Sequence, residues 1–114
     1  MGRRSRSSAG AIMFALALSA CGSPAPPMTP AERGRIVYMT NCIICHNPDP
    51  NLPGSQGPPI AGSSRELVYD RLMFLKYPPG YTPKQNTHVM RALPQLVNRI
   101  DDLTAFLADA AKQD

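Results

Sequence analysis

The chain has 114 residues, with 12 Lys and Arg against 8 Asp and Glu and a formal charge of +4. Three of the basic residues lie within the first six positions. The rest of the chain is therefore almost neutral and has no basic stripe interleaved with aromatic side chains, which excludes a nucleic-acid-binding protein. The length allows one domain at most, and thirteen prolines favour short helices joined by ordered loops.

The N-terminus has the pattern of an export signal. A basic start is followed by an apolar run over residues 11–18, too short to span a bilayer, and then by small residues. Cys21 directly follows Ser19 and Ala20, which resembles the lipobox of bacterial lipoproteins. The resemblance implies that residues 1–20 are a signal peptide and that Cys21 carries lipid. An ordinary secretory signal with an unmodified cysteine is the alternative, and both interpretations export the protein.

Residues 21–29, rich in Pro, Ala and Ser, are expected to form a flexible tether to a domain over residues 30–114. The expected location is a bacterial membrane, with the domain facing the periplasm or the cell exterior. A domain this small buries only a modest core, and such domains usually need disulfides, a metal or a cofactor for stability.

The first helix is predicted from Pro30 to about Thr40. Thr29 as N-cap and Glu32 three residues later form a capping box, and Pro30 stands where its missing N–H costs nothing. Gly34 lies inside this helix, where glycine costs about 1 kcal/mol relative to alanine. We therefore expect another helix to approach Gly34 closely.

A Cys-x-x-Cys-His sequence follows the first helix and matches the pattern of c-type haem attachment. Two thiols about one helical turn apart can each bond one porphyrin edge, and the adjacent imidazole then lies beneath the iron. Cys42 and Cys45 are therefore the predicted thioether residues for one covalent haem c. His46 is the predicted proximal ligand of the iron.

Two other interpretations of the cysteine pair were weighed. A thioredoxin-like redox pair expects a βαβ setting, and no strand-forming runs are evident. A zinc knuckle needs a second pair of ligands, whereas Cys21 and His88 are distant and unpaired. A Cys-x-x-Cys-His sequence can also occur by chance, so the flanking chain must decide.

Gly34, three residues, Tyr38, three residues and then the Cys-x-x-Cys-His sequence together resemble the first helix and haem site of class I cytochromes c. The resemblance implies an all-α fold, a cytochrome c-like domain of short helices wrapped around one covalently bound haem. It also implies that Gly34 and Tyr38 pack against the C-terminal helix.

Residues 47–62 contain five prolines and three glycines, so we expect a constrained loop. Residues 57–62, Gly-Pro-Pro-Ile-Ala-Gly, are similar to a Gly-Pro-x-Leu-x-Gly segment of the same family. The similarity implies that a backbone carbonyl near Pro58 accepts the second ring N–H of His46 and fixes its tautomer. A proline-rich surface loop without that role is the alternative.

A second helix is predicted to begin at a capping box of Ser63 and Glu66 and to run to about Lys76. Its apolar stripe has helical spacing and is expected to face the core. The proline-rich residues 77–83 end the helix. The stripe consists of Val68, Leu72 and Leu75.

The sixth ligand of the iron is expected after this loop. Met90 resembles the distal methionine of the family, although Arg91 and Ala92 separate it from the next proline. A thioether ligand favours ferrous iron and raises the reduction potential. His88 is the main competitor, and Met73 is a weaker one because its position indicates a core residue.

The last helix is predicted to begin near Asn98, with Asp101 and Asp102 in its first turns, where they favour the helix dipole. Residues 103–107 resemble the segment that meets the first helix in cytochromes c. The apolar stripe comprises Ile100, Leu103, Leu107 and Ala110.

These features predict a single-electron carrier rather than an enzyme. Its partners would be a redox protein donor and acceptor, with a membrane contact through lipid and no small-molecule substrate. One alternative is a haem-bearing subunit of a larger membrane oxidoreductase. Another is a haem enzyme or gas sensor with an open sixth position, which a bond from Met90 to the iron would exclude.

Overall fold

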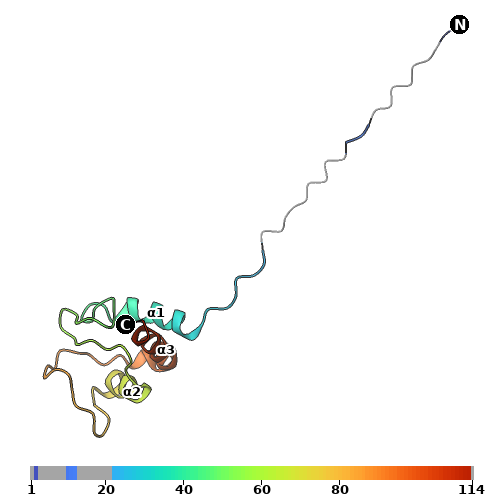
Figure 1. Ribbon diagram of the computed structural model, residues 1–114. Helices are drawn as coiled ribbons and strands as arrows, with labels where there is room; N and C mark the ends of the chain where they lie inside the picture. Colours follow the sequence, from blue (N-terminus) through green and yellow to red (C-terminus); the bar gives the residue numbers. More distant parts are fainter. Residues whose placement is uncertain (1, 3–9, 13–21, 114) are drawn as a thin grey trace.

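The structure is a computed structural model that describes residues 2, 10–12 and 22–113. Cys21 and most of the predicted signal peptide lie outside the described residues. Residues 22–29 lead into the first helix without regular structure. The described part of the chain contains no strand, so the predicted all-α class is confirmed. The elements, in chain order, are α1 (Pro30–Asn41), α2 (Arg65–Phe74), the 3₁₀ helix η1 (Pro94–Arg99) and α3 (Ile100–Ala111) (Figure 1).

The predicted start of α1 is confirmed. The Thr29 hydroxyl accepts a hydrogen bond from the Glu32 N–H at 3.2 Å, and the Glu32 carboxylate accepts one from the Thr29 N–H at 2.6 Å. The helix continues to Asn41, one residue beyond the predicted end. None of the helices in the described ranges is long and apolar enough to cross a membrane.

The predicted capping box of α2 is wrong by one residue. Ser63 donates its hydroxyl to the Ile60 carbonyl at 2.7 Å, so it stabilises the preceding turn instead. Ser64 is the N-cap and accepts from the Leu67 N–H at 3.2 Å. The helix ends at Phe74, before the predicted Lys76, because Leu75 turns into the left-handed region at φ 56°.

The predicted N-cap of α3 at Asn98 is also wrong. Asn98 lies inside η1, where the backbone is already helical, whereas an N-cap needs an extended backbone. The 3₁₀ helix leads directly into α3 at Ile100. Asp101 and Asp102 do occupy the first turn, as predicted.

The helices α1 and α3 pack closely against each other (Figure 1). A Cβ on Gly34 would overlap the Asp102 carbonyl oxygen and would lie 2.9 Å from the Phe106 Cβ. The rings of Tyr38 and Phe106 are 5.1 Å apart, and Tyr38 is fully buried. The predicted packing of Gly34 and Tyr38 against the C-terminal helix is therefore confirmed.

An ion pair joins the same two helices. The Arg33 guanidinium donates from Nε and Nη2 to the two carboxylate oxygens of Asp102, at 3.0 and 2.8 Å. This hydrogen bond raises the pKa of Arg33 and lowers the pKa of Asp102, so both groups are charged at neutral pH. A second cation, Arg99, lies 3.7 Å from Asp102.

The hydrophobic core lies between α3 and the elements that pack on it. The predicted stripe of α3 is buried at all four positions. In the stripe of α2, Val68 and Leu72 are buried, whereas Leu75 is exposed because the helix has already ended. The core cluster comprises Tyr38, Val68, Leu72, Leu96, Ile100, Leu103 and Leu107.

Candidate functional site

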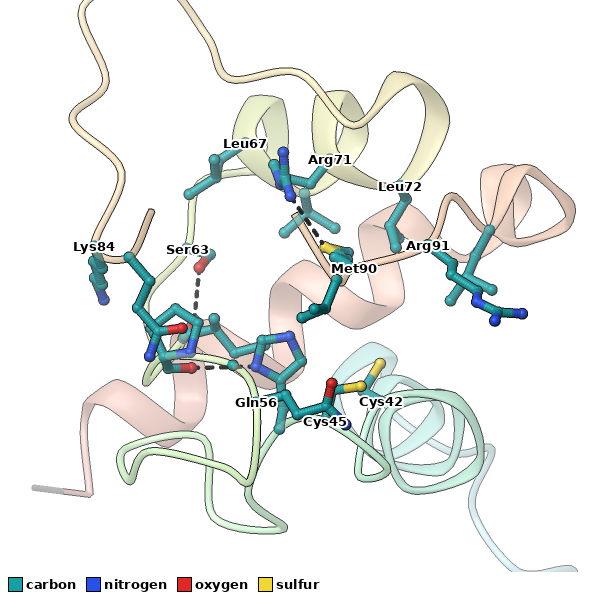
Figure 2. A pocket seen from close by; sticks show the side chains of 18 of the residues that line it. Cys42, Cys45, Gln56, Ser63, Leu67, Arg71, Leu72, Lys84, Met90 and Arg91 are labelled. Carbon is teal, nitrogen blue, oxygen red and sulfur yellow. Dashed lines mark hydrogen bonds between the residues drawn. The ribbon is translucent and has the colours of Figure 1, made fainter. Parts of the chain in front are cut away.

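A cavity of about 530 Å³ lies beside the core, and the residues singled out by the sequence meet there. Figure 2 shows Cys42 and Cys45 entering from the end of α1, and Met90 entering from the loop that precedes η1. The cavity has an apolar floor formed by α2 and α3. The floor residues are Leu67, Val68, Leu72, Leu103 and Leu107.

The Cys-x-x-Cys-His sequence forms a tight turn at the end of α1. The Cys42 N–H donates to the Tyr38 carbonyl at 2.9 Å and so completes the last turn of the helix. The Cys42 carbonyl then accepts from the N–H groups of Cys45 and His46, at 3.2 and 2.9 Å. This turn brings both free thiols and the imidazole to the same cavity.

The His46 ring has one nitrogen held by the backbone. Nδ1 lies 3.2 Å from the Pro58 carbonyl oxygen, and since a carbonyl only accepts, Nδ1 carries the proton. Burial lowers the pKa of His46 and this hydrogen bond partly opposes it, so the ring is neutral at pH 7. Nε2 therefore keeps its lone pair, as a metal ligand requires.

Glycine at position 57 allows the loop to approach the His46 ring. A Cβ on Gly57 would overlap the ring carbon Cε1 and would lie 2.5 Å from Nδ1. The same loop is bonded to α3, because the Gly62 N–H donates to the Leu107 carbonyl at 2.8 Å. The loop that carries the Pro58 carbonyl is therefore anchored to α3, the helix that also forms part of the cavity floor.

Of the residues considered as distal ligands, Met90 borders the cavity. It is half-buried, and its sulfur lies 3.7 Å from the Arg71 Nη2 (Figure 2). His88 is exposed, and neither His88 nor Met73 lines the cavity. Met73 and Met90 both pack against the core, and of the two Met90 also borders the cavity.

The charged side chains that line the cavity are all basic. They are Arg71, Lys84 and Arg91, and no Asp or Glu lines the cavity with them. Sequence reasoning missed this feature. For Arg71 a signal was available: it lies four residues after Leu67, so the two side chains share one face of α2. Lys84 and Arg91 lie in a loop, where no periodicity indicates direction.

The geometry does not support the two alternatives for the cysteine pair. A thioredoxin-like pair uses a thiol of lowered pKa, whereas burial raises the pKa of Cys42 to about 11. Across the described ranges, no group of three or more His, Cys, Asp or Glu side chains is arranged to hold a metal ion. The described residues therefore offer no zinc knuckle.

The residues around the cavity fit a covalent haem. The volume of the cavity lies within the range of about 300–1,000 Å³ typical of cofactor sites, and the floor of the cavity is apolar. A haem takes thioether bonds and axial ligands from the protein, and the lining supplies two thiols, one neutral imidazole and one thioether. The three basic side chains are complementary to an acidic cofactor such as one bearing propionates.

Comparisons of the chain with known protein families, with curated protein sequences and with solved structures found no match.

Proposed function

We propose that this protein is a single-haem electron carrier of the class I cytochrome c type, with haem c attached at Cys42 and Cys45. One observation supports the proposal above the others. Met90, more than forty residues from the cysteine pair in sequence, borders the same cavity as Cys42, Cys45 and His46.

Each of these residues would have one role. Cys42 and Cys45 would hold the cofactor by thioethers, and His46 would ligate the iron through Nε2. Met90 would be the distal ligand through its sulfur. When bound, the haem would supply a one-electron couple between ferrous and ferric iron.

The chain's own contribution is to keep this set rigid and dry. The Pro58 carbonyl holds Nδ1 of His46 and so fixes the ring's orientation. The apolar floor offers water no hydrogen-bond partner, and the α1–α3 packing holds the end of α1 that carries the turn. A fixed ligand set and a dry site reduce the rearrangement that accompanies a change of charge.

The proposal extends to partners and location. An electron carrier needs a redox protein donor and acceptor, and no substrate pocket separate from the cofactor cavity is required. The tether to a bacterial envelope membrane depends on the sequence around Cys21, which lies outside the described residues. Mass spectrometry of the mature protein would test it, because lipid and signal cleavage change the mass at Cys21.

The test of haem binding is an absorption spectrum with a pyridine hemochrome assay on protein produced with export and haem-maturation machinery. We expect one covalent haem per chain, resistant to extraction by acid acetone. Cys42→Ala and Cys45→Ala should each remove one thioether, and the double variant should be colourless. A colourless wild-type protein, or haem that leaves under acid acetone, would contradict the proposal.

The distal ligand separates this proposal from a gas sensor or haem enzyme. We expect the weak near-infrared band of methionine-ligated ferric haem in the wild type, and its loss in Met90→Ala. His88→Ala is the matched control and should keep the band, because His88 is exposed and outside the cavity. Rapid carbon monoxide binding to the reduced wild type would favour an open sixth position instead.

A further inference from the structure

The Arg71 guanidinium is the cationic group bonded to the sulfur of Met90. Its Nη2 lies 3.7 Å from that sulfur, and Figure 2 shows this contact inside the cavity. Lys84, another cation of the lining, is bonded elsewhere, since its Nζ donates to the Pro59 carbonyl at 2.8 Å. Of these two cations of the lining, Arg71 is directed at the thioether and Lys84 is held by a loop.

The guanidinium is held in place by two further contacts. Its Nη1 donates to the Leu75 carbonyl at 2.6 Å, which the left-handed turn at Leu75 directs back toward the helix. Its Cζ atom lies over the Tyr77 ring, 4.2 Å from the ring centroid. Tyr77 in turn stacks on Tyr81, with the ring centroids 5.4 Å apart and an angle of 10° between the ring planes. Arg71 is thus fixed by a carbonyl on one side and an aromatic stack on the other.

We propose that Arg71 is a positioning residue that holds the Met90 sulfur in the cavity and biases the haem toward its ferrous state. This inference rests on the proposed function. A planar guanidinium has five donors in a rigid fork and stacks on aromatic rings, so it can hold a carbonyl, a ring and a sulfur in one fixed geometry, whereas an ammonium is a compact charge on a flexible stem. It therefore orders a thioether in a loop that has no helix to hold it.

The bias follows from charge. The ferrous state carries one positive charge fewer than the ferric state, so a fixed cation beside the ligand disfavours the ferric state more. A hydrogen bond from Arg71 to the Met90 sulfur also withdraws electron density from this iron ligand. Hydrogen bonds around the ligands tune the reduction potential of a haem. Both effects raise the reduction potential.

The experiment is a redox titration of the haem-loaded full-length protein. Arg71→Gln should lower the ratio of ferrous to ferric protein at a fixed solution potential about three- to tenfold, the effect of one partly screened charge. Lys76→Gln is the matched control: it removes the same charge from an exposed position just after α2, outside the cavity lining, and should change the ratio much less. The near-infrared band and the NMR shift of the Met90 methyl group report whether the sulfur stays bound.

Arg71→Lys provides a second variant that keeps the charge and loses the planar fork. Its potential should lie between those of the wild type and Arg71→Gln, and its Met90 methyl signal should broaden. A wild-type potential in Arg71→Lys would overturn the positioning role. Equal shifts in Arg71→Gln and Lys76→Gln, or no shift in either, would overturn the inference while leaving a methionine-ligated carrier. A wild type without haem or without the band would overturn the proposed function as well.

Discussion

The two sides of this domain are closed in different ways. The α1–α3 side is closed by protein alone: a glycine against a backbone, the ring pair of Tyr38 and Phe106, and a two-point ion pair. The other side consists of α2 and a loop over residues 75–93, and a cavity separates it from the end of α1. One side therefore has its packing partners within the chain, and the other has a space that a cofactor would fill.

This difference separates residues that stabilise the fold from residues that serve the site. Changes at the α1–α3 contact should reduce stability whether or not haem is bound. Changes at the cavity should alter haem binding and leave the helices intact. Tyr38 joins the two sides, because its hydroxyl donates to the Asn47 carbonyl at 2.5 Å, directly after the Cys-x-x-Cys-His turn.

The largest effect is expected from Gly34→Ala. The added methyl group would overlap the Asp102 backbone, so α1 and α3 must move apart at their closest point. We expect a loss of about 3 kcal/mol in the free energy of unfolding, at the upper end for overpacked sites. Urea unfolding followed by far-UV circular dichroism measures it.

Gly22→Ala is the control for that change, since a Cβ on Gly22 meets nothing within 4 Å. Its unfolding curve should coincide with that of the wild type. If Gly34→Ala were as stable as Gly22→Ala, the close contact between α1 and Asp102 would be wrong.

Gly57→Ala tests the cavity side with the same chemical change. The methyl group would push the His46 ring away from the Pro58 carbonyl. We expect haem loading to fall about tenfold, the lower end for losing a partner of a metal ligand. Hemochrome absorbance per mole of protein measures the loading, and an unchanged far-UV spectrum would show that the helices are intact. Full loading would mean that the ring does not depend on this loop.

The ion pair between α1 and α3 predicts a dependence on pH. The hydrogen bond from Arg33 lowers the pKa of Asp102 in the folded protein, against about 3.9 in an unfolded chain. Its stabilisation is present above the unfolded value and is lost as the pH falls through the lower folded value. The urea concentration at the midpoint of wild-type unfolding should therefore decrease when the pH is lowered below about 4.

Asp102→Asn should lower the midpoint at neutral pH and remove this part of the acid dependence. Asp101→Asn is the matched control on the same helix turn, because the carboxylate of Asp101 is paired with Arg65 at the surface. Surface pairs contribute little, so its midpoint should stay close to that of the wild type. An acid dependence that survives in Asp102→Asn would assign it to other carboxylates.

The smallest effect is expected from Tyr38→Phe. The ring stays in the core against Phe106, and only the hydrogen bond to the Asn47 carbonyl is lost. We expect a loss of about 1 kcal/mol in the free energy of unfolding. Haem loading should decrease slightly, because Asn47 follows the proximal histidine. A stability equal to that of the wild type would show that water replaces the hydroxyl at this carbonyl.

Local features were predictable wherever they depend on residues a few positions apart. The capping box of Thr29 and Glu32 was correct because both of its bonds lie within one turn. The capping box at Ser63 was wrong because the helix begins one residue later: Ser64 is the N-cap, and the third helical residue is Leu67, whose side chain cannot accept a hydrogen bond. Residue identities do not indicate which of two adjacent serines a turn will use.

By itself the sequence determined the all-α class, the closeness of Gly34 and Tyr38 to the last helix, and the Cys-x-x-Cys-His turn. The helices follow from capping and periodicity and the turn from its spacing, whereas the contact of Gly34 and Tyr38 with the last helix was implied by the resemblance to class I cytochromes c. Only the tertiary structure decided that Met90 borders the cavity while His88 faces solvent, and that Arg71 contacts the Met90 sulfur. Those contacts join a helix to an irregular loop, and the direction of a side chain in such a loop is set by packing rather than by a repeat.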